Sequence, residues 1–212
     1  MIAPETAAAL RSVRESGCRV VLVTGRRADD LRAVCSDLDV FDTVVAENGA
    51  VLLDPRSDRG EDLAAPPPPA FLARLRARGV PAVAGRVIVA TVRPHETAVG
   101  EVIRELGLDL EIIFNIEAVM VLPRGISKGG GLAAALARIG VPARDTVGVG
   151  DGENDLDFLE RIGLAAAVAN AVPEVAGAAD FVSSAPNGAG VREVARALLA
   201  GELDGRRRNR NP

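Results

Sequence analysis

The sequence predicts a doubly wound, mostly parallel α/β core that carries an inserted small α/β subdomain. Three observations lead to this fold class. Aliphatic runs such as residues 20–23 are too short for helices and are typical of buried parallel strands. These runs alternate with segments whose apolar residues recur at helical spacing. Residues 54–69 are polar and rich in proline, which marks a boundary where the alternation is interrupted.

The composition of the chain narrows its class. The 212 residues are 48% hydrophobic, which is enough for one domain with an insertion or for two small domains. Aromatic residues make up only 2% and the net charge is −4, so nucleic acid is not expected as a partner. Cys18 and Cys35 form no zinc motif and are expected to be reduced thiols. The sequence shows no membrane span and no signal peptide, so we expect a cytoplasmic protein and leave its oligomeric state open.

The first part of the core is expected to contain a helix, a strand, a second helix and a hairpin, over residues 4–16, 20–23, 28–38 and 43–53. Pro4 suits the first turn of a helix and Gly17 suits a helix end. The turn at 24–26 ends the first strand. Asn48-Gly49, placed between two apolar runs, is the strongest short-range signal of a hairpin.

The insertion is expected to hold a basic helix, a strand, a helix and two strands, over residues 71–78, 87–92, 96–106, 110–116 and 118–122. The short connection between the last two strands favours antiparallel pairing. Helices and strands then alternate again, over residues 128–139, 146–150, 164–168, 172–178, 180–183 and 190–199. Ser127 is a suitable N-cap for the first of these helices.

The chemistry of the chain is expected in the stretch 146–159, TVGVGDGENDLDFL. It runs from a buried strand into an acidic loop and then into a helix. The acidic residues are Asp151, Glu153, Asp155 and Asp157. Mg²⁺ requires oxygen ligands, and open α/β sheets bind ligands at the carboxyl ends of their strands. The alternative is a solvated acidic turn in which carboxylates favour a helix N-terminus.

Two other motifs fail at this stretch. An EF-hand loop that begins at Asp151 needs glycine at its sixth position, where Leu156 stands. A dinucleotide-binding fingerprint that begins at Gly148 needs a third glycine, where Glu153 stands. The acidic loop therefore predicts neither a calcium site of that kind nor a dinucleotide site.

Two further residues predict a phosphoryl site around the acidic loop. Thr24 follows a strand, so its hydroxyl and the next N–H groups can face the same edge of the sheet, although by itself it reads as a turn residue. Lys128 begins a glycine-rich helix, whose free N–H groups attract an anion, and its ammonium adds a positive charge. The alternative is a solvated lysine. A hydroxyl, an ammonium and carboxylates suit phosphoryl transfer, which depends on positioning and charge neutralisation.

These motifs resemble the haloacid dehalogenase-like hydrolases. TGR at 24–26, Lys128 before a helix and GDGENDLDFL at 150–159 are similar to the second, third and fourth motifs of that family, and ENG at 47–49 also fits. The insertion resembles a type IIB cap, an α/β lid found in Cof-like sugar phosphatases, sucrose-phosphate phosphatase and phosphoglycolate phosphatase. The resemblance implies a Rossmann-like core at 1–54 and 123–200 and a cap at 55–122. The remaining polar, basic residues 201–212 are expected to be disordered.

The resemblance implies an Mg²⁺-dependent hydrolase of a small phosphorylated metabolite, a sugar phosphate or a phosphoglycolate-like compound. Its catalytic residues would be Thr24 and Lys128. The residues implied to bind substrate are Thr24, Gly25, Arg26, Asn48 and Lys128. The residues implied to bind the metal are Asp151, Asp155 and Asn154. Glu153 and Asp157 are expected to be loop residues without a role in the site.

The first motif of that family is absent from this sequence. It is a strand ending in Asp-x-Asp, whose nucleophile forms an aspartyl-phosphate, and it precedes a helix that resembles 4–16. The letters Asp37-Leu38-Asp39 follow a helix rather than an apolar strand. One hypothesis is a shortened phosphatase that is inactive or impaired as it stands. Its alternatives are a non-catalytic protein that binds phosphorylated ligands or partners and, less favoured, a phosphomutase.

Overall fold

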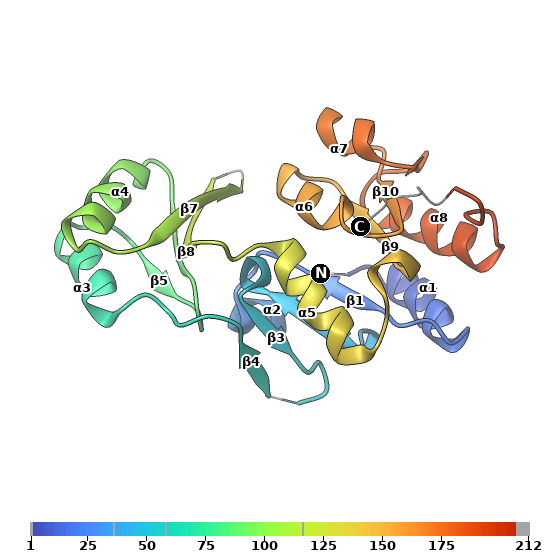
Figure 1. Ribbon diagram of the computed structural model, residues 1–212, viewed down its shortest axis with the longest axis horizontal. Coiled ribbons are helices and arrows are strands. Elements are labelled where there is room, and N and C mark those ends of the chain that lie inside the picture. The colour runs from blue at the N-terminus through green and yellow to red at the C-terminus, as the bar shows by residue number, and fades with distance from the viewer. Residues whose placement is uncertain (1, 36, 58, 116, 207–212) are drawn as a thin grey trace.

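The computed structural model describes residues 2–35, 37–57, 59–115 and 117–206. It has two lobes (Figure 1). The larger lobe, here called the core, contains both ends of the described chain. The smaller lobe, here called the inserted module, runs from the start of α3 (Pro69–Ala77) to the end of β8 (Ala118–Pro123). Each lobe combines helices with a sheet, so the predicted α/β class with an inserted α/β subdomain is confirmed.

The first core sheet has the strand order β1-β2-β3-β4. Its strands are β1 (Val21–Val23), β2 (Thr43–Ala46), β3 (Val51–Leu53) and β4 (Gly60–Asp62). The strands β1 and β2 are parallel, and the other two pairs are antiparallel. The hairpin predicted around Asn48-Gly49 is therefore confirmed. Two helices flank β1 in the sequence, α1 (Pro4–Glu15) and α2 (Ala28–Val34), and a 3-10 turn follows, η1 (Leu38–Val40).

The second core sheet is fully parallel, in the order β11-β10-β9. Its strands are β9 (Val147–Gly150), β10 (Leu164–Ala167) and β11 (Phe181–Val182). The helices of this part are α5 (Lys128–Ile139), α6 (Leu156–Leu159), α7 (Pro173–Ala178) and α8 (Asn187–Leu199). Among the described residues, the predicted doubly wound core is thus divided into two sheets, with β1 at the edge of one and β9 at the edge of the other.

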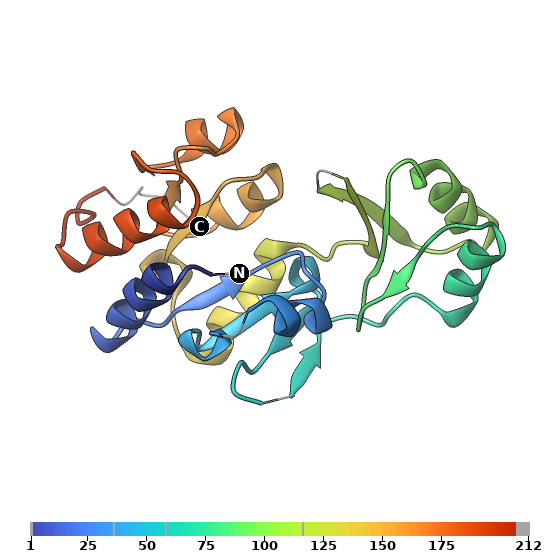
Figure 2. The ribbon, with the colours of Figure 1, turned by 180° about the vertical axis from the view of Figure 1, so that it is seen from behind.

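Helices hold the two core sheets together from both sides (Figure 2). On one side, Leu132 of α5 packs in a cluster with Phe158 of α6, and Ala135 packs with Val45 of β2. On the other side α1 lies against α8. There the Thr6 hydroxyl donates to the Gly188 carbonyl at 3.3 Å. Helices therefore lie on both sides of the two core sheets.

The inserted module is a four-stranded antiparallel sheet in the order β5-β6-β8-β7, with helices on one face. Its other strands are β5 (Val83–Ala84), β6 (Val89–Val92) and β7 (Leu110–Asn115), and its second helix is α4 (Glu96–Glu105). Phe71 and Leu75 of α3 pack with Val99 of α4 and Val121 of β8 to form its own apolar centre. The antiparallel pairing predicted for the last two strands is confirmed.

The inserted module begins later in the chain than the sequence predicts. Residues 55–62 were predicted to belong to it, but β4 pairs with β3 and so extends the core sheet. Gly60-Glu61-Asp62 gives no hydrophobic signal, because this edge strand is largely exposed. Similarly, β5 has only two residues, both exposed, and was not predicted.

The prediction of a disordered tail over 201–212 is wrong for residues 201–206. Residues 201–205 form turns, and Leu203 is 2% exposed in a cluster with Leu164 and Val194. One buried leucine is enough to hold a short polar segment against the core. Residues 207–212 lie outside the described part of the chain. Within the described part, no helix combines the length and apolar character needed to cross a membrane.

Candidate functional site

Two loops, at the ends of β1 and β2, are hydrogen-bonded to each other. Asn48 N donates to Thr24 O at 3.1 Å, and Glu47 N donates to Arg26 O at 3.0 Å. Glu47 and Asn48 have positive φ angles of 54° and 56°, which cost energy in residues with side chains. The two bonds hold that conformation. Thr24 Oγ1 accepts from Arg26 N at 3.2 Å, so the hydroxyl proton can still be donated to another acceptor.

Gly49 brings the N-terminus of α5 against these loops. Its φ is 100°, and a Cβ atom at this position would lie 1.9 Å from the Ser127 carbonyl oxygen. Only glycine permits this close approach. Ser127 caps the helix as predicted, since its hydroxyl accepts from Gly130 N at 3.1 Å. The first residue of the helix is Lys128, which is 8% exposed.

Lys128 links α5 to the acidic loop that follows β9. Its Nζ lies 2.6 Å from Asp155 Oδ1. The other carboxylate oxygen, Asp155 Oδ2, accepts from Asp151 N at 3.0 Å and from Gly152 N at 3.2 Å. Packing and hydrogen bonds therefore run without a break from Thr24 through Gly49 and Lys128 to Asp155. The structure thus places the predicted site residues Thr24, Lys128 and Asp155 at the carboxyl ends of β1 and β9.

The acidic loop offers Asp151 and Asp155 as carboxylates for a cation. Desolvation raises the pKa of the Asp151 carboxyl above its usual range, the nearby Asp155 carboxylate raises it further, and Lys128 partly offsets the two. In the described ranges, no three or more His, Cys, Asp or Glu side chains form a ready metal site. Mg²⁺ is commonly held by one or two carboxylates together with water and substrate phosphate. The chemistry of this pair of residues fits such an open Mg²⁺ site.

The donor atoms of the acidic loop differ in their availability. Both oxygens of Asp155 already have partners, so this side chain could reach a cation through water or after displacing Lys128. Asp151 is exposed. Asn154 Nδ2 is buried and makes no hydrogen bond in the described structure, and its amide oxygen is the atom that a hard cation would bind. Asp151 is therefore the most accessible of the three predicted metal ligands.

Asn48, which was predicted to bind substrate, is buried. Its side chain lies between Gly25 and β8, where Nδ2 is 3.2 Å from Met120 Sδ. Asn48 is 1% exposed, and its Oδ1 atom makes no hydrogen bond within the described structure. This placement joins the loop after β1 to the inserted module. Gly25 itself is half-buried and Arg26 is exposed.

Asp157 was expected to be a loop residue, but it has a structural function. It lies on α6, and its Oδ2 accepts from Gly129 N at 2.7 Å, while Oδ1 pairs with Arg161 at 2.6 Å. Burial raises the pKa of Asp157, but hydrogen bonds from Ser127, Arg161 and Gly129 N outweigh burial and lower it overall. A carboxylate facing a helix N-terminus is favourable. Glu153, by contrast, is exposed, as expected of a loop residue.

The segment Asp37-Leu38-Asp39 lies near the amino ends of β1 and β2, opposite to the carboxyl ends where the predicted site residues lie. Asp37 pairs with Arg11 of α1 at 2.7 Å. The nearby Asp42 accepts from Val20 N, at the amino end of β1, at 2.9 Å. These residues are therefore remote from the carboxyl ends of the strands and cannot supply the missing Asp-x-Asp.

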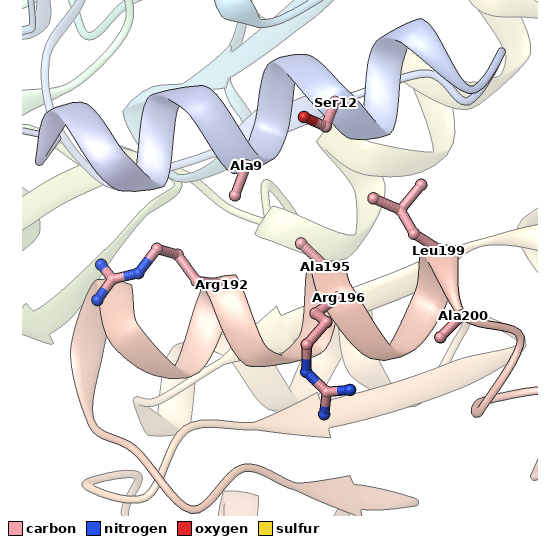
Figure 3. A pocket seen from close by; sticks show the side chains of 7 residues that line it. All are labelled: Ala9, Ser12, Arg192, Ala195, Arg196, Leu199 and Ala200. Carbon is pink, nitrogen blue, oxygen red and sulfur yellow. The ribbon is translucent and has the colours of Figure 1, made fainter.

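A surface hollow lies between α1 and α8 (Figure 3). It is lined by Ala9, Ser12, Arg192, Ala195, Arg196, Leu199 and Ala200. Arg192 donates to the Thr6 hydroxyl at 3.1 Å, and Arg196 pairs with Glu202 at 2.8 Å. Arg192 thus helps to hold α8 against α1, whereas the Arg196–Glu202 pair lies within the C-terminal part of the chain. None of the predicted site residues lines this hollow.

Comparison with known proteins assigns the family. The sequence pattern of haloacid dehalogenase-like hydrolases matches residues 1–64 and 114–194, on either side of most of the inserted module. A phosphoglycolate phosphatase from Methanothermobacter thermautotrophicus is 32% identical over 203 residues, which cover 92% of this chain and 90% of the relative.

Two solved structures share the fold. A haloacid dehalogenase-like hydrolase from Bacteroides thetaiotaomicron superposes with a TM-score of 0.79 at 18% identity, covering 93% of both chains. A sugar phosphatase of HAD subclass IIB superposes with a TM-score of 0.69 at 19% identity, covering 94% of this chain and 92% of its own. The chain belongs to the haloacid dehalogenase-like hydrolase family.

Proposed function

We propose that this chain is an Mg²⁺-dependent phosphomonoester hydrolase that acts on a small phosphorylated metabolite, a sugar phosphate or a phosphoglycolate-like compound. The observation that carries the proposal is the Lys128–Asp155 pair of 2.6 Å, which joins the acidic loop to α5, and Gly49 packs α5 against the loop that is bonded to Thr24. The Thr24 hydroxyl, the Lys128 ammonium and the carboxylates of Asp151 and Asp155 then lie near the carboxyl ends of the core strands β1 and β9. The relative from M. thermautotrophicus bears the name phosphoglycolate phosphatase, which supports this substrate class.

Each residue of the site would act on the phosphoryl group through charge or a hydrogen bond. Thr24 and the backbone N–H groups of Gly25 and Arg26 would bind and orient its oxygens. Lys128 would neutralise the charge that develops on them. Asp151 and Asp155 would hold Mg²⁺, with Asn154 nearby. A bound Mg²⁺ would supply further neutralisation of the phosphate oxygens.

The nucleophile would stand on a strand between β1 and β9. Each of these strands ends its sheet in the described structure, and each runs toward the predicted site. The side chains of β1, and all but the last of β9, are only partly buried, although they are apolar or glycine. Val21 and Val23 of β1 pack against the same cluster as Leu132 of α5 and Phe158 of α6. The helices α5 and α6 therefore pack over both β1 and β9.

One added parallel strand would join the two core sheets. It would satisfy the free N–H and C=O groups of β1 and β9 and cover their half-exposed side chains. Its carboxyl end would open between Thr24 and Asp151, where an Asp-x-Asp could attack the phosphorus and form an aspartyl-phosphate. We propose that the present chain is inactive or impaired without such a strand.

The inserted module would act as a cap that surrounds the rest of the substrate. Its sheet carries helices on one face, and on the other face Met120 reaches Asn48 at the edge of the site. Ile113 of the same sheet packs against the main core cluster. We further propose that the protein is cytoplasmic and acts on a soluble metabolite rather than on nucleic acid or membrane.

Phosphate release from an aryl phosphate tests the proposal. The present chain would be compared with a form whose N-terminus is extended by an apolar strand ending in Asp-x-Asp, with and without Mg²⁺. We expect only the extended form to turn over, and only with Mg²⁺. Asp151→Asn in the extended form should abolish turnover. Turnover by the present chain would contradict our account of the nucleophile. Phosphate binding without turnover in either form would favour a non-catalytic binding protein.

A further inference from the structure

The inserted module contacts the core at a hairpin tip as well as through its two connections. The tip consists of residues 85–88, between β5 and β6. Val87 is 0% exposed and Ile88 is 1% exposed, and both belong to the main core cluster rather than to the cluster of the module. The module therefore places two apolar side chains inside the core.

A single carboxylate binds the backbone of this tip. Glu47 is 0% exposed. Its Oε2 accepts from Val87 N at 2.9 Å and from Ile88 N at 3.0 Å, and its Oε1 accepts from Arg86 N at 3.0 Å. Oε1 also lies 3.3 Å from Ala28 N, at the N-terminus of α2. A buried carboxylate is costly unless several donors compensate it, and here four N–H groups do so.

The hairpin tip is shaped to receive this carboxylate. A Cβ atom at Gly85 would lie 2.5 Å from Glu47 Oε1, so the backbone approaches closer than a side chain would permit. On either side of the tip, Arg27 donates to the Ala84 carbonyl at 2.9 Å, and Arg86 pairs with Asp62 at 2.6 Å. Core and module are therefore held together at one compact contact centred on Glu47.

The loop that receives the tip is also the loop that supports the site. Glu47 N is bonded to Arg26 O, and Asn48 N is bonded to Thr24 O. The next residue, Gly49, packs against the carbonyl of Ser127 just before Lys128. A displacement of the tip would thus be transmitted through one residue to the turn that contains Thr24.

We propose that Glu47 is a positioning residue, which fixes the inserted module on the core and holds it in a set place beside the Thr24 loop. In this arrangement the module keeps one orientation relative to the core and does not rotate freely about its two connections. The mechanical part of the proposal rests on the described contacts alone. Its effect on substrate turnover rests on the proposed function.

Electron paramagnetic resonance distances between the lobes test the mechanical part in the present chain. Cys18 is exposed on the core and would carry one spin label, with Arg76→Cys on α3 carrying the second and Cys35→Ala removing the buried thiol. We expect one narrow distance distribution in this parent. Glu47→Gln, which replaces an acceptor oxygen by a donor amide, should broaden it. A narrow, unchanged distribution in folded Glu47→Gln would overturn the proposal.

Two matched variants separate the contact from general effects of substitution. Glu61→Gln removes an exposed carboxylate from β4 and should leave the distribution narrow. Gly85→Ala disturbs the same contact from the side of the module and should broaden it as Glu47→Gln does. If Glu47→Gln fails to fold, the distance distribution of Gly85→Ala tests the proposal in its place. A narrow distribution in Gly85→Ala, or equal broadening in Glu61→Gln, would count against Glu47.

Kinetics of the extended, hydrolytic form test the effect on turnover. We expect Glu47→Gln to lower kcat/KM for a sugar phosphate by roughly tenfold to a hundredfold, because displaced site residues lose alignment. The loss for a small aryl phosphate, which would contact the module less, should be smaller. Equal losses for both substrates would indicate a merely structural role. If the extended form shows no hydrolysis, the proposed function fails while the distance measurements still decide the role of Glu47.

Discussion

Lys128 Nζ lies 2.6 Å from Asp155 Oδ1, and both side chains are only 9% exposed. The pair joins the first turn of α5 to the loop after β9, and Asp155 uses its second oxygen to hold the backbone of that loop. A cation at a helix N-terminus is unfavourable by itself, so the buried carboxylate is what stabilises Lys128 there. The pair is therefore both a structural link and the charged centre of the proposed site.

Removing one partner of this pair should be costlier than removing both charges. We expect Lys128→Met to lower the free energy of unfolding by about 3–5 kcal/mol, because Asp155 is left buried and unpaired. The double variant Lys128→Met with Asp155→Asn should lose less than the sum of its single variants. Urea unfolding of the four proteins measures this. Strictly additive losses would show that the two side chains do not interact.

Asp151→Asn should stabilise the protein in the absence of Mg²⁺ at neutral pH. The pKa of Asp151 is raised in the folded state, so the folded protein binds its proton more readily than the unfolded chain does. The charged carboxylate therefore opposes folding fully above the raised folded pKa, and its effect fades as the pH falls from there to the unfolded value of about 3.9. Thermal unfolding in a chelator across this pH range checks the sign. Added Mg²⁺ should stabilise the parent and not the variant.

Asp157→Asn should have the opposite pH dependence. The pKa of Asp157 is lowered in the folded state, so its contribution is fully present above the unfolded value of about 3.9 and is lost as the pH falls through the lower folded value. We expect a loss of about 1 kcal/mol at pH 7, typical of a helix-capping group. Arg161→Gln, which removes one exposed partner, should cost less. Equal stability of parent and Asp157→Asn at pH 7 would contradict the capping role.

Gly49→Ala and Gly107→Ala form a matched pair. Both glycines have a positive φ, 100° and 62°, so both substitutions carry a conformational cost of roughly 1–2 kcal/mol. A Cβ atom at Gly107 meets no atom within 4 Å, whereas at Gly49 it would lie 1.9 Å from the Ser127 carbonyl. We therefore expect Gly49→Ala to be much the more damaging in chemical denaturation. Similar losses would show that the Gly49 loop can move away from α5.

The sequence predicted elements well where their apolar pattern was long. The helix over 128–139 and the hairpin around Asn48-Gly49 were found in place. The helix expected over 28–38 instead ends at Val34. Leu38 and Val40 are buried in a 3-10 turn, and burial there produces the same apolar spacing as a continuing helix. The polar strand β4 exists only through its pairing with β3, a long-range cause that leaves no local pattern.

Part of the candidate site could be predicted from the sequence. Thr24, Lys128 and the acidic loop could be proposed because a hydroxyl, an ammonium and several carboxylates together follow strands or begin a helix. The contacts of Glu47 and Asp157 were missed because their partners are backbone N–H groups, which almost every residue has. Only the fold shows which of these groups a carboxylate meets. The same reason explains Leu203, whose burial depends on a surface provided by α8 and β10.

The packing of α1 on α8 has a consequence for the order in which the chain folds during synthesis. The hydrogen bond from Thr6 to Gly188 spans 182 residues, so α1 is synthesised long before the α8 helix that covers it. At about 5–20 residues per second this interval lasts roughly ten seconds or longer. The inserted module is a continuous segment with its own apolar centre, and it can form earlier. The core therefore leaves apolar side chains of its early elements uncovered until its later elements are made, whereas the module can bury its own earlier.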